Sequence, residues 1–367
     1  MMAKKKEYYR LDRMDKLKDI RYALLLGQRA NGKSYAVKER VLQNAWNKDE
    51  RFVYLRRYVL DIKMNAVTSY FDDAPVKDIT NGAWERVIAY QGYLYWCKYD
   101  EQTQKDIKSK DPIGRYCALN EDGRYKSQVF EKVTTIVFEE MIPLDSMYLD
   151  NEPTRLQQFA STVFRREKGI VYLIGNTLSR VSPYSREWNI DFLRMKIGDL
   201  NEYHFHVKDE DGNESIINVA VEYCSVTKYE NTMFFGKASK QILSGEWEVT
   251  DVPKLPKPLK DFEVLYKVLV EYQNFKFVIQ LLCDSSNGGL ICHVYPETHD
   301  FNGFRILTDR FSTNPMISAR LDMSKRPEYC IAECFALNKL CFSDNLTGAD
   351  FSAVNKHFHI ANMLDFE

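Results

Sequence analysis

The sequence predicts an α/β protein whose first domain has a mainly parallel sheet, followed by a linker region and a small second α/β domain. Two observations support this prediction. Short runs of buried-type residues recur at 22–26, 51–58, 136–138 and 170–176, and helical patterns follow the first run and precede the last. Alternating strands and helices are typical of a parallel sheet that helices cover on both faces.

Composition narrows the class of protein before any motif is considered. The chain has 367 residues, of which 45% are hydrophobic and 28% charged, as in soluble globular proteins of two or three domains. No apolar run approaches the roughly 18 residues of a membrane span, and the first residues lack the apolar core of a signal peptide. We therefore expect a cytosolic protein without membrane contact. The net charge of −1 means that any contact with nucleic acid must be local.

The first strand leads into a glycine loop. The segment GQRANGKS, residues 27–34, fits the pattern G-x-x-x-x-G-K-[ST], and apolar residues return at helical spacing after it. In such a loop the backbone N–H groups converge on phosphate oxygens, and the helix start adds about half a positive charge. Lys33 would reach the outer phosphates, and Ser34 would ligate Mg²⁺. The predicted nucleotide-binding residues are Gly27, Gln28, Arg29, Ala30, Asn31, Gly32, Lys33 and Ser34. The alternative is an ordinary strand-to-helix turn with a solvated lysine.

A later strand ends in two acids. In TTIVFEEM the apolar residues 136–138 are followed by Glu139 and Glu140. In P-loop ATPases the acid that ends such a strand holds the Mg²⁺ shell, and a glutamate directly after it polarises the attacking water. The first acid is usually Asp, so the longer Glu139 could contact the metal through water. These motifs predict ATP and Mg²⁺ as cofactors, and the alternative is a strand that ends in solvated acids.

The elements between these two motifs are strands and turns. Residues 51–58 predict a second core strand that ends in two arginines. Residues 86–98 predict an aromatic hairpin that turns at Gln91–Gly92, and a further turn is expected at Asp122–Gly123.

A helix and a strand complete the first domain. The amphipathic helix has Pro153 near its start and Gly169 as its stop, and the strand 170–176 follows it. This strand ends in Asn176, where many such ATPases carry a polar sensor of the γ-phosphate. We therefore expect residues 1–200 to form a P-loop ATPase domain of the RecA/ASCE type.

The chain beyond residue 200 reads as a linker region and a second domain. A β-hairpin is expected around Asp211–Gly212, and the Pro/Lys run 253–260 predicts a boundary linker. The linker region is thus expected over 201–261. Residues 262–367 then form a small α/β unit with a hairpin NFKFVIQLLCDSSNGGLICHVYP, a strand FRILTD and a helix RPEYCIAECFALNKLCF.

Several short motifs together resemble one family. GQRANGKSYA, FVYLRRY, YKS before TTIVFEE, TVFRRE and GNTLSRVSPY occur in matching order and at nearly matching separations. They resemble the DNA-packaging ATPases of small short-tailed phages with protein-primed linear genomes. The resemblance covers residues 20–190 well and the remainder loosely. It implies a homo-oligomeric ring motor, expected to be pentameric, that drives double-stranded DNA into an empty procapsid.

The resemblance also implies a location and partners. The motor would work in the host cytoplasm and dock transiently at the portal vertex of the procapsid, and participation of an RNA adaptor stays open.

The same resemblance assigns roles to individual residues. Glu139 takes the metal position and Glu140 is the catalytic glutamate. Arg165 takes the position of a finger arginine, and Lys126 that of a lysine acting from the neighbouring subunit. From the residues alone, Arg165 could equally be an exposed helix arginine and Lys126 a solvated turn lysine.

In this family the C-terminal region is ribonuclease-H-like. A two-metal nuclease needs converging carboxylates, usually beginning with an Asp in the first strand. The strand taken as first, FVIQLLC, has no acid before Asp284. We therefore expect a degenerate domain without nuclease activity over residues 262–367.

Two other classes of function remain as alternatives. A GTPase should carry N-K-x-D late in its core, whereas the chain has only NKDE at 47–50. A small-molecule kinase or an ATP-gated scaffold that does not translocate DNA stays open.

Overall fold

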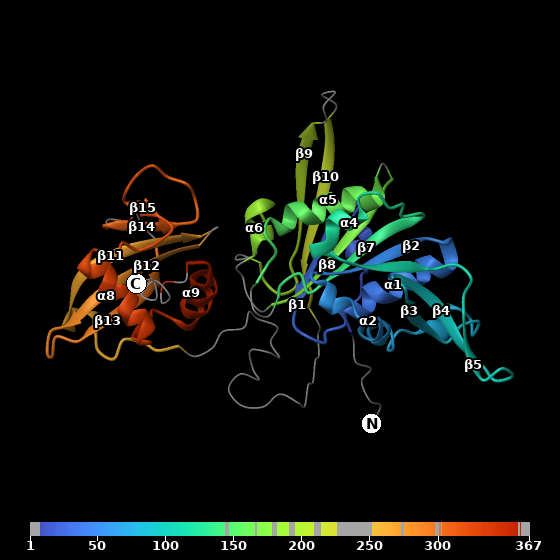
Figure 1. The fold of residues 1–367 in the computed structure, drawn as a ribbon, viewed down its shortest axis with the longest axis horizontal. Helices are drawn as coiled ribbons and strands as arrows, with labels where there is room; N and C mark the ends of the chain where they lie inside the picture. The colour runs from blue at the N-terminus through green and yellow to red at the C-terminus, as the bar shows by residue number, and fades with distance from the viewer. Residues whose placement is uncertain are drawn as a thin grey trace. The chain divides into compact units, whose positions relative to one another are not determined.

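The computed structural model describes residues 8–143, 147–165, 167–177, 182–190, 195–208, 214–225, 252–272, 275–297, 301, 303–358 and 360. The chain divides into two compact units, residues 1–178 with 193–246 and residues 179–192 with 247–367 (Figure 1). The first unit contains a large, mostly parallel sheet and the second a smaller sheet. The predicted α/β class with two sheets is confirmed.

The large sheet has ten strands in the order β3-β4-β6-β2-β7-β8-β1-β10-β9, and β5 pairs with β4. The inner strands, from β6 across to β10, are all parallel, and the pairs at both edges are antiparallel. The strands are β1 (Ile20–Gly27), β2 (Arg51–Arg56), β3 (Arg86–Tyr90), β4 (Tyr93–Asp100), β5 (Lys105–Lys108), β6 (Gly114–Ala118), β7 (Val133–Glu139), β8 (Ile170–Asn176), β9 (Leu200–Lys208) and β10 (Glu214–Tyr223).

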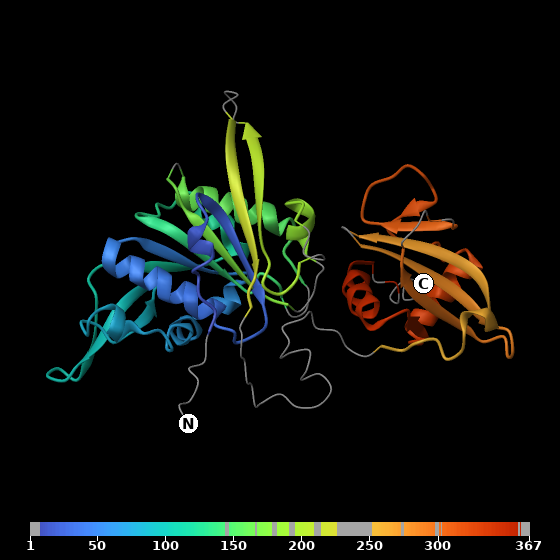
Figure 2. The same ribbon diagram turned by 180° about the vertical axis from the view of Figure 1, so that it is seen from behind.

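Helices cover both faces of this sheet, as Figures 1 and 2 show. The long helices α1 (Lys33–Lys48) and α5 (Glu152–Phe164) lie on opposite faces. The short helical segments of the first unit are η1 (Met14–Lys16), η2 (Val59–Ile62), α2 (Met64–Tyr70), α3 (Val76–Ile79), η3 (Leu119–Glu121) and α4 (Asp122–Tyr125). A further short helix, α6 (Pro183–Glu187), falls within the second unit.

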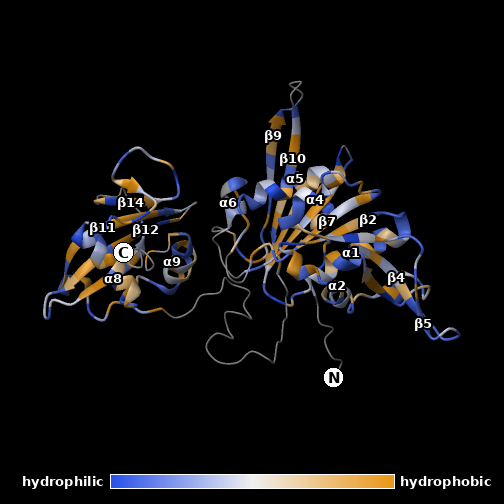
Figure 3. Ribbon diagram, in the orientation of Figure 1, coloured by the Kyte–Doolittle hydropathy of each residue, from blue (hydrophilic) through white to orange (hydrophobic). Residues whose placement is uncertain are grey.

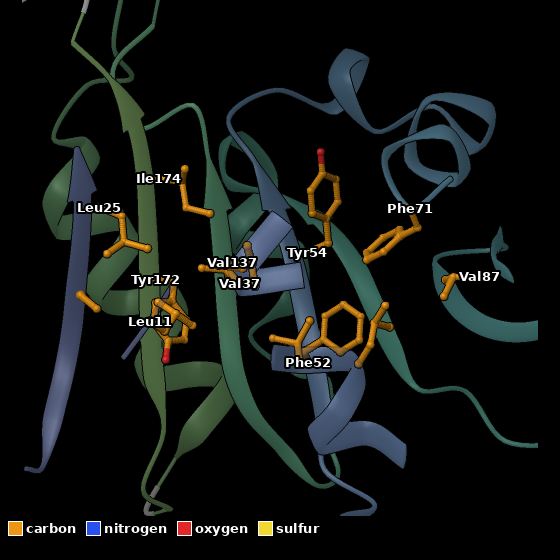
Figure 4. Packing of buried hydrophobic residues seen from close by; sticks show 14 of the residues in the cluster. Leu11, Leu25, Val37, Phe52, Tyr54, Phe71, Val87, Val137, Tyr172 and Ile174 are labelled. Carbon is orange, nitrogen blue, oxygen red and sulfur yellow. The ribbon is translucent and has the colours of Figure 1, made fainter. Parts of the chain in front are cut away.

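The main hydrophobic core lies between the sheet and α1. Val37 of α1 packs against Val137 of β7, with Phe52 and Tyr54 of β2 beside them (Figure 4). Full burial of one such side chain contributes about 1.5–3 kcal/mol. Because side chains alternate along a strand, the intervening residues such as Phe138 face the α5 side. Figure 3 shows the resulting contrast between apolar inner strands and hydrophilic loops.

Local sequence signals predicted one turn correctly and one wrongly. The hairpin of β3 and β4 turns at Gln91–Gly92 as predicted, and both residues have positive φ, 49° and 85°. Asp122–Gly123, predicted as a turn, instead begins helix α4.

The predicted boundary at residue 200 is wrong. Strands β9 and β10 form the expected hairpin, but β10 pairs in parallel with β1, with Ala220 opposite Ala23. Residues 219–223 of β10 are buried between β1 and β9. The first unit therefore includes residues that were predicted as linker. The predicted turn at Asp211–Gly212 lies outside the described residues.

The second unit is built on a six-stranded mixed sheet in the order β15-β14-β11-β12-β13-β16. Its strands are β11 (Phe262–Tyr272), β12 (Phe275–Asp284), β13 (Leu290–Pro296), β14 (Arg305–Thr308), β15 (Ile317–Ser318) and β16 (Leu340–Phe342). Its remaining helices are η4 (Leu259–Asp261), α8 (Arg326–Ala336) and α9 (Asn345–Phe358). The predicted hairpin is β12–β13, and the predicted strand FRILTD is β14.

Two expectations about the second unit are corrected. Its first strand is β11, whose antiparallel pairing with β12 was not foreseen, and not FVIQLLC. The predicted linker 253–260 packs on this unit, since Pro253 O accepts a hydrogen bond from Phe342 N at 2.9 Å. Lys257 Nζ also lies 2.8 Å from a carboxylate oxygen of Asp284.

In the part of the chain that the structure describes, no helix has both the length and the apolar character that crossing a bilayer requires.

Candidate active site

The glycine loop joins β1 to α1, as predicted. Gly32 has φ 98°, and a Cβ there would lie 2.9 Å from the Cβ of Tyr8 and 3.2 Å from the backbone N of Tyr9. A Cβ on Gly27 would lie 2.9 Å from both the Asn31 side chain and a backbone oxygen. Only glycine fits at either position, because Cβ contacts of this length are prohibitive and a φ of 98° is unfavourable for other residues. Tyr9 N donates to Asn31 O at 2.9 Å, which ties the N-terminal segment to the loop.

Lys33 lies at the centre of the loop. Its ammonium donates to the carbonyl oxygens of Gln28 and Gly27 at 2.7 and 3.1 Å, and to Asn31 Oδ1 at 3.0 Å. The residue is 3% exposed, and this burial lowers the pKa of Lys33 to about 8. Phosphate oxygens would compete for the same three protons, because they carry a full negative charge and the carbonyls do not. Of the other loop residues, Gln28 and Asn31 are buried, whereas Arg29 and Ala30 are exposed.

Glu139 ends β7 beside the start of α1. Its Oε1 accepts a hydrogen bond from the Tyr70 hydroxyl at 2.6 Å, and the Ser34 side chain also bonds to this carboxylate. Burial raises the pKa of Glu139, and these two hydrogen bonds oppose that rise. Carboxylate and hydroxyl oxygens are hard ligands of the kind that Mg²⁺ prefers. The contact between Ser34 and Glu139 therefore fits the predicted metal position.

Glu140 differs from Glu139 in its backbone conformation, its exposure and its partners. Its backbone is left-handed, with φ 59°, and its side chain is 57% exposed. The carboxylate pairs with the guanidinium of Arg56 at the end of β2. The two adjacent acids thus have different environments, one buried and bonded to hydroxyls, the other exposed and paired with an arginine.

Arg57 holds the loop that follows β7. Its guanidinium forms a bidentate pair with Glu152 at 2.6 and 2.8 Å, and both residues are buried. It also donates to the carbonyl oxygens of Glu140 and Met141, each at 2.9 Å. The strand-ending arginine pair was recognised in the sequence, but nothing there indicated that one arginine pairs with Glu140 and the other fixes its backbone.

Two flanking strands complete the surroundings of the loop. On one side β8 places Asn176 directly opposite Gly27. On the other side Cys224, just beyond β10, donates its N–H to Leu26 O at 2.7 Å. Cys224 was missed, because the pairing of β10 with β1 is a long-range feature that local patterns do not encode.

Arg165 lies away from the glycine loop, beside the segment that follows Lys126. Arg165 directly follows α5, and its guanidinium donates to Gln128 O at 3.2 Å, two residues beyond Lys126. Glu152, at the opposite end of α5, bonds to Arg57 near the carboxyl end of β7. A 13-residue helix spans about 20 Å, so Arg165 lies at the amino-terminal edge of the sheet. The structure does not bring it to the loop of its own chain.

A parallel sheet with a glycine loop between its strand β1 and helix α1 defines a P-loop protein. Residues 3–192 match the model of the family described as Podovirus DNA encapsidation protein (Gp16). This match includes more than half of the chain, and the chain belongs to that family. The resemblance inferred from the sequence motifs is confirmed.

Individual relatives agree with this assignment. The DNA packaging protein of Bacillus phage B103 is 30% identical over 166 residues, 44% of this chain and 45% of that protein. The DNA packaging protein of Bacillus phage phi29 is 29% identical over 189 residues, 51% of this chain and 49% of that protein. The chain thus spans about half the length of the curated relatives it matches.

One solved structure shares the fold over nearly the whole chain. The bacteriophage Phi-29 viral genome packaging motor assembly matches with a TM-score of 0.56 and 20% identity, covering 96% of this chain and 99% of that one.

Proposed function

We propose that the chain is an ATP-driven motor that translocates double-stranded viral DNA into an empty procapsid through its portal. The observation that carries this proposal is that Lys33 and Ser34 both interact with Glu139, with Glu140 directly after it in the chain, in a chain of a DNA encapsidation family. The loop supplies phosphate contacts and the acids supply a metal position and a base, which together are the parts that phosphoryl transfer to water needs.

The chemistry follows from the environments of these residues. Lys33 and the loop N–H groups bind and orient the phosphates, and Ser34 with Glu139 would hold Mg²⁺. When bound, Mg²⁺ neutralises charge that develops on the transferred phosphoryl group. Glu140 accepts a proton from the attacking water, a contribution of about 10²–10⁴ in rate. Because its carboxylate pairs with Arg56, Glu140 must leave that ion pair before it can act as a base.

The site is completed by a second subunit. Arg165 is exposed and lies about one helix length from its own loop, so it can stabilise the γ-phosphoryl charge only at the site of a neighbour. Lys126, also exposed, would act across the same boundary. This arrangement requires a homo-oligomeric ring, which we expect to be pentameric. ATPase activity per subunit should therefore rise with protein concentration, and a concentration-independent rate over the range where rings form would contradict a shared site.

The partners and the finer fold assignments belong to the same proposal. The first unit would be a RecA/ASCE-type motor domain and the second a ribonuclease-H-like domain. The motor would act in the host cytoplasm and transiently at the portal vertex. Whether an RNA adaptor takes part stays open. The phi29 chain that shares this fold belongs to a viral genome packaging motor assembly, which supports a multi-component machine of this kind.

We also propose that the second unit does not cut DNA. Asp284, the first acid of the predicted site, bonds to Lys257 at 2.8 Å and to Ser286 N at 2.9 Å. These contacts lower the pKa of Asp284 to about 2 and engage its carboxylate in the β12–β13 turn. Full-length protein should leave supercoiled plasmid intact in Mg²⁺ or Mn²⁺. Metal-dependent nicking that is lost when Asp284 and Asp309 are both replaced would contradict this proposal.

DNA-stimulated hydrolysis tests the motor against its alternatives. Double-stranded DNA should raise the ATPase rate of the wild-type chain, and Lys33→Ala should abolish hydrolysis with or without DNA. A GTPase, a small-molecule kinase or a nucleotide-gated scaffold should not respond to DNA. A rate unchanged by DNA, under conditions where rings form, would favour one of those classes.

A further inference from the structure

Helix α2 places Tyr70 against the acid at the predicted metal position. The Tyr70 hydroxyl donates to Glu139 Oε1 at 2.6 Å, a short hydrogen bond between a phenol and a carboxylate. Tyr70 ends α2, in the segment between β2 and β3, whereas Glu139 ends β7. An element remote in sequence thus touches the carboxylate directly.

The ring of Tyr70 is itself fixed on two sides. It packs at a tilt on Tyr54 of β2 with ring centroids 4.5 Å apart, and it packs edge-on against Phe71 at 4.9 Å. The ammonium of Lys38 lies 4.2 Å from the ring centroid. Lys38 also bonds to the carbonyl oxygen of Tyr70 and to Asp73. These contacts fix the Tyr70 ring, and its hydroxyl points toward Glu139.

Because residue 139 is a glutamate, a hydrogen bond that orients its carboxylate would help metal binding. Glutamate has one more rotatable bond than the aspartate usual at this position, so its carboxylate has more orientations to lose when a cation binds. A hydrogen-bond partner that holds one oxygen removes part of that freedom in advance, as outer-shell partners of metal ligands do.

We propose that Tyr70 is a positioning residue that fixes the Glu139 carboxylate for Mg²⁺·nucleotide. The proposal rests on the function proposed above, because it takes Glu139 as the metal-binding acid. It predicts that the Tyr70 hydroxyl contributes to metal affinity and not to the binding of metal-free nucleotide, which contacts the loop.

The test measures metal binding directly. Mn²⁺ is titrated into protein saturated with a non-hydrolysable ATP analogue, and free Mn²⁺ is read by electron paramagnetic resonance, with Mg²⁺ added as a competitor. Tyr70→Phe should weaken Mn²⁺ binding roughly tenfold, the lower end for loss of an outer-shell partner. Binding of the analogue in EDTA should stay unchanged.

Tyr54→Phe is the matched control. It is the same substitution in the ring packed on Tyr70, but the Tyr54 hydroxyl bonds to the Arg56 side chain. It should leave Mn²⁺ affinity unchanged. In a Glu139→Gln background, where the metal ligand is already lost, Tyr70→Phe should have little further effect, which general destabilisation would not reproduce.

The outcomes separate this proposal from the function on which it rests. If Glu139→Gln weakens Mn²⁺ binding but Tyr70→Phe behaves like Tyr54→Phe, the positioning role is wrong and the metal assignment stands. If Glu139→Gln leaves Mn²⁺ affinity unchanged, the metal assignment itself is wrong. Equal loss of metal-free nucleotide binding in Tyr70→Phe would show a structural role and would overturn the proposal.

Discussion

Lys33 owes its low pKa of about 8 to burial, which makes nucleotide binding depend on pH. Phosphates attract the charged ammonium, and the free site loses that charge as pH rises through about 8. The secondary ionisation of phosphate, near pH 6, is complete below this range. The affinity for metal-free ATP should therefore fall between pH 7.5 and 9.5 in an equilibrium binding assay.

The control for this prediction is Lys33→Arg, whose guanidinium stays charged throughout the range. Its affinity is expected to be independent of pH, whatever its absolute value. A wild-type affinity that does not change up to pH 9.5 would show that Lys33 does not titrate in the free site.

The different environments of Glu139 and Glu140 predict different defects. Glu140→Gln should bind Mg²⁺·ATP normally but hydrolyse it at least about a hundredfold more slowly, since it removes the proposed base. Glu139→Gln should raise the Mg²⁺ concentration needed for nucleotide binding. Binding and single-turnover measurements distinguish the two defects, and the reverse pattern would mean that the roles are exchanged.

At the level of elements, Arg57 links β2, α5 and the loop after β7. Removing one partner of a buried ion pair leaves an uncompensated charge, which costs about 3–5 kcal/mol. Arg57→Ala should lower the free energy of unfolding by that amount in denaturant titrations. The exposed pair of Arg86 and Asp106 provides the control, because Arg86→Ala should cost less than about 1 kcal/mol. Equal effects of the two substitutions would argue against a clamp at Arg57.

Local sequence patterns predicted the elements that nearby residues determine. The strand, glycine loop and helix at 20–48 follow from apolar runs and two glycines, and the Gln91–Gly92 turn follows from residues that accept positive φ. By contrast, β10 was read as part of a linker and β11 was not foreseen. Their burial comes from pairing with strands distant in sequence, and no local pattern records that pairing.

The same distinction applies to the candidate site. The loop residues and both acids were predicted, because each ends or follows a recognisable strand. Tyr70, Cys224 and the Arg57–Glu152 pair were missed, since each reaches the site from an element whose position depends on the folded sheet. The roles of Arg165 and Lys126 came from the family resemblance, and the roles of all the candidate site residues stay predictions.

For the whole molecule, the separation between Arg165 and its own glycine loop predicts complementation between subunits. Arg165→Ala and Glu140→Gln chains should each be inactive. In mixed rings some interfaces pair an intact Glu140 with a neighbour's intact Arg165, so the mixture should recover ATP hydrolysis. The measurement is the ATPase rate against mixing ratio.

Titration of each mutant into wild-type chains is the control for this experiment, because it shows whether one inactive subunit stops the ring. No recovery in rings that demonstrably mix and tolerate an inactive subunit would contradict a shared site.

The proposed motor function is tested most directly by packaging. Wild-type chains, ATP and linear double-stranded DNA are combined with procapsids that carry their portal, nuclease is added, and protected DNA is measured. We predict protected DNA whose amount depends on ATP and that is absent with Lys33→Ala or with a non-hydrolysable analogue. The absence of protected DNA from the wild-type reaction, while DNA still stimulates hydrolysis by procapsid-bound chains, would contradict a packaging motor.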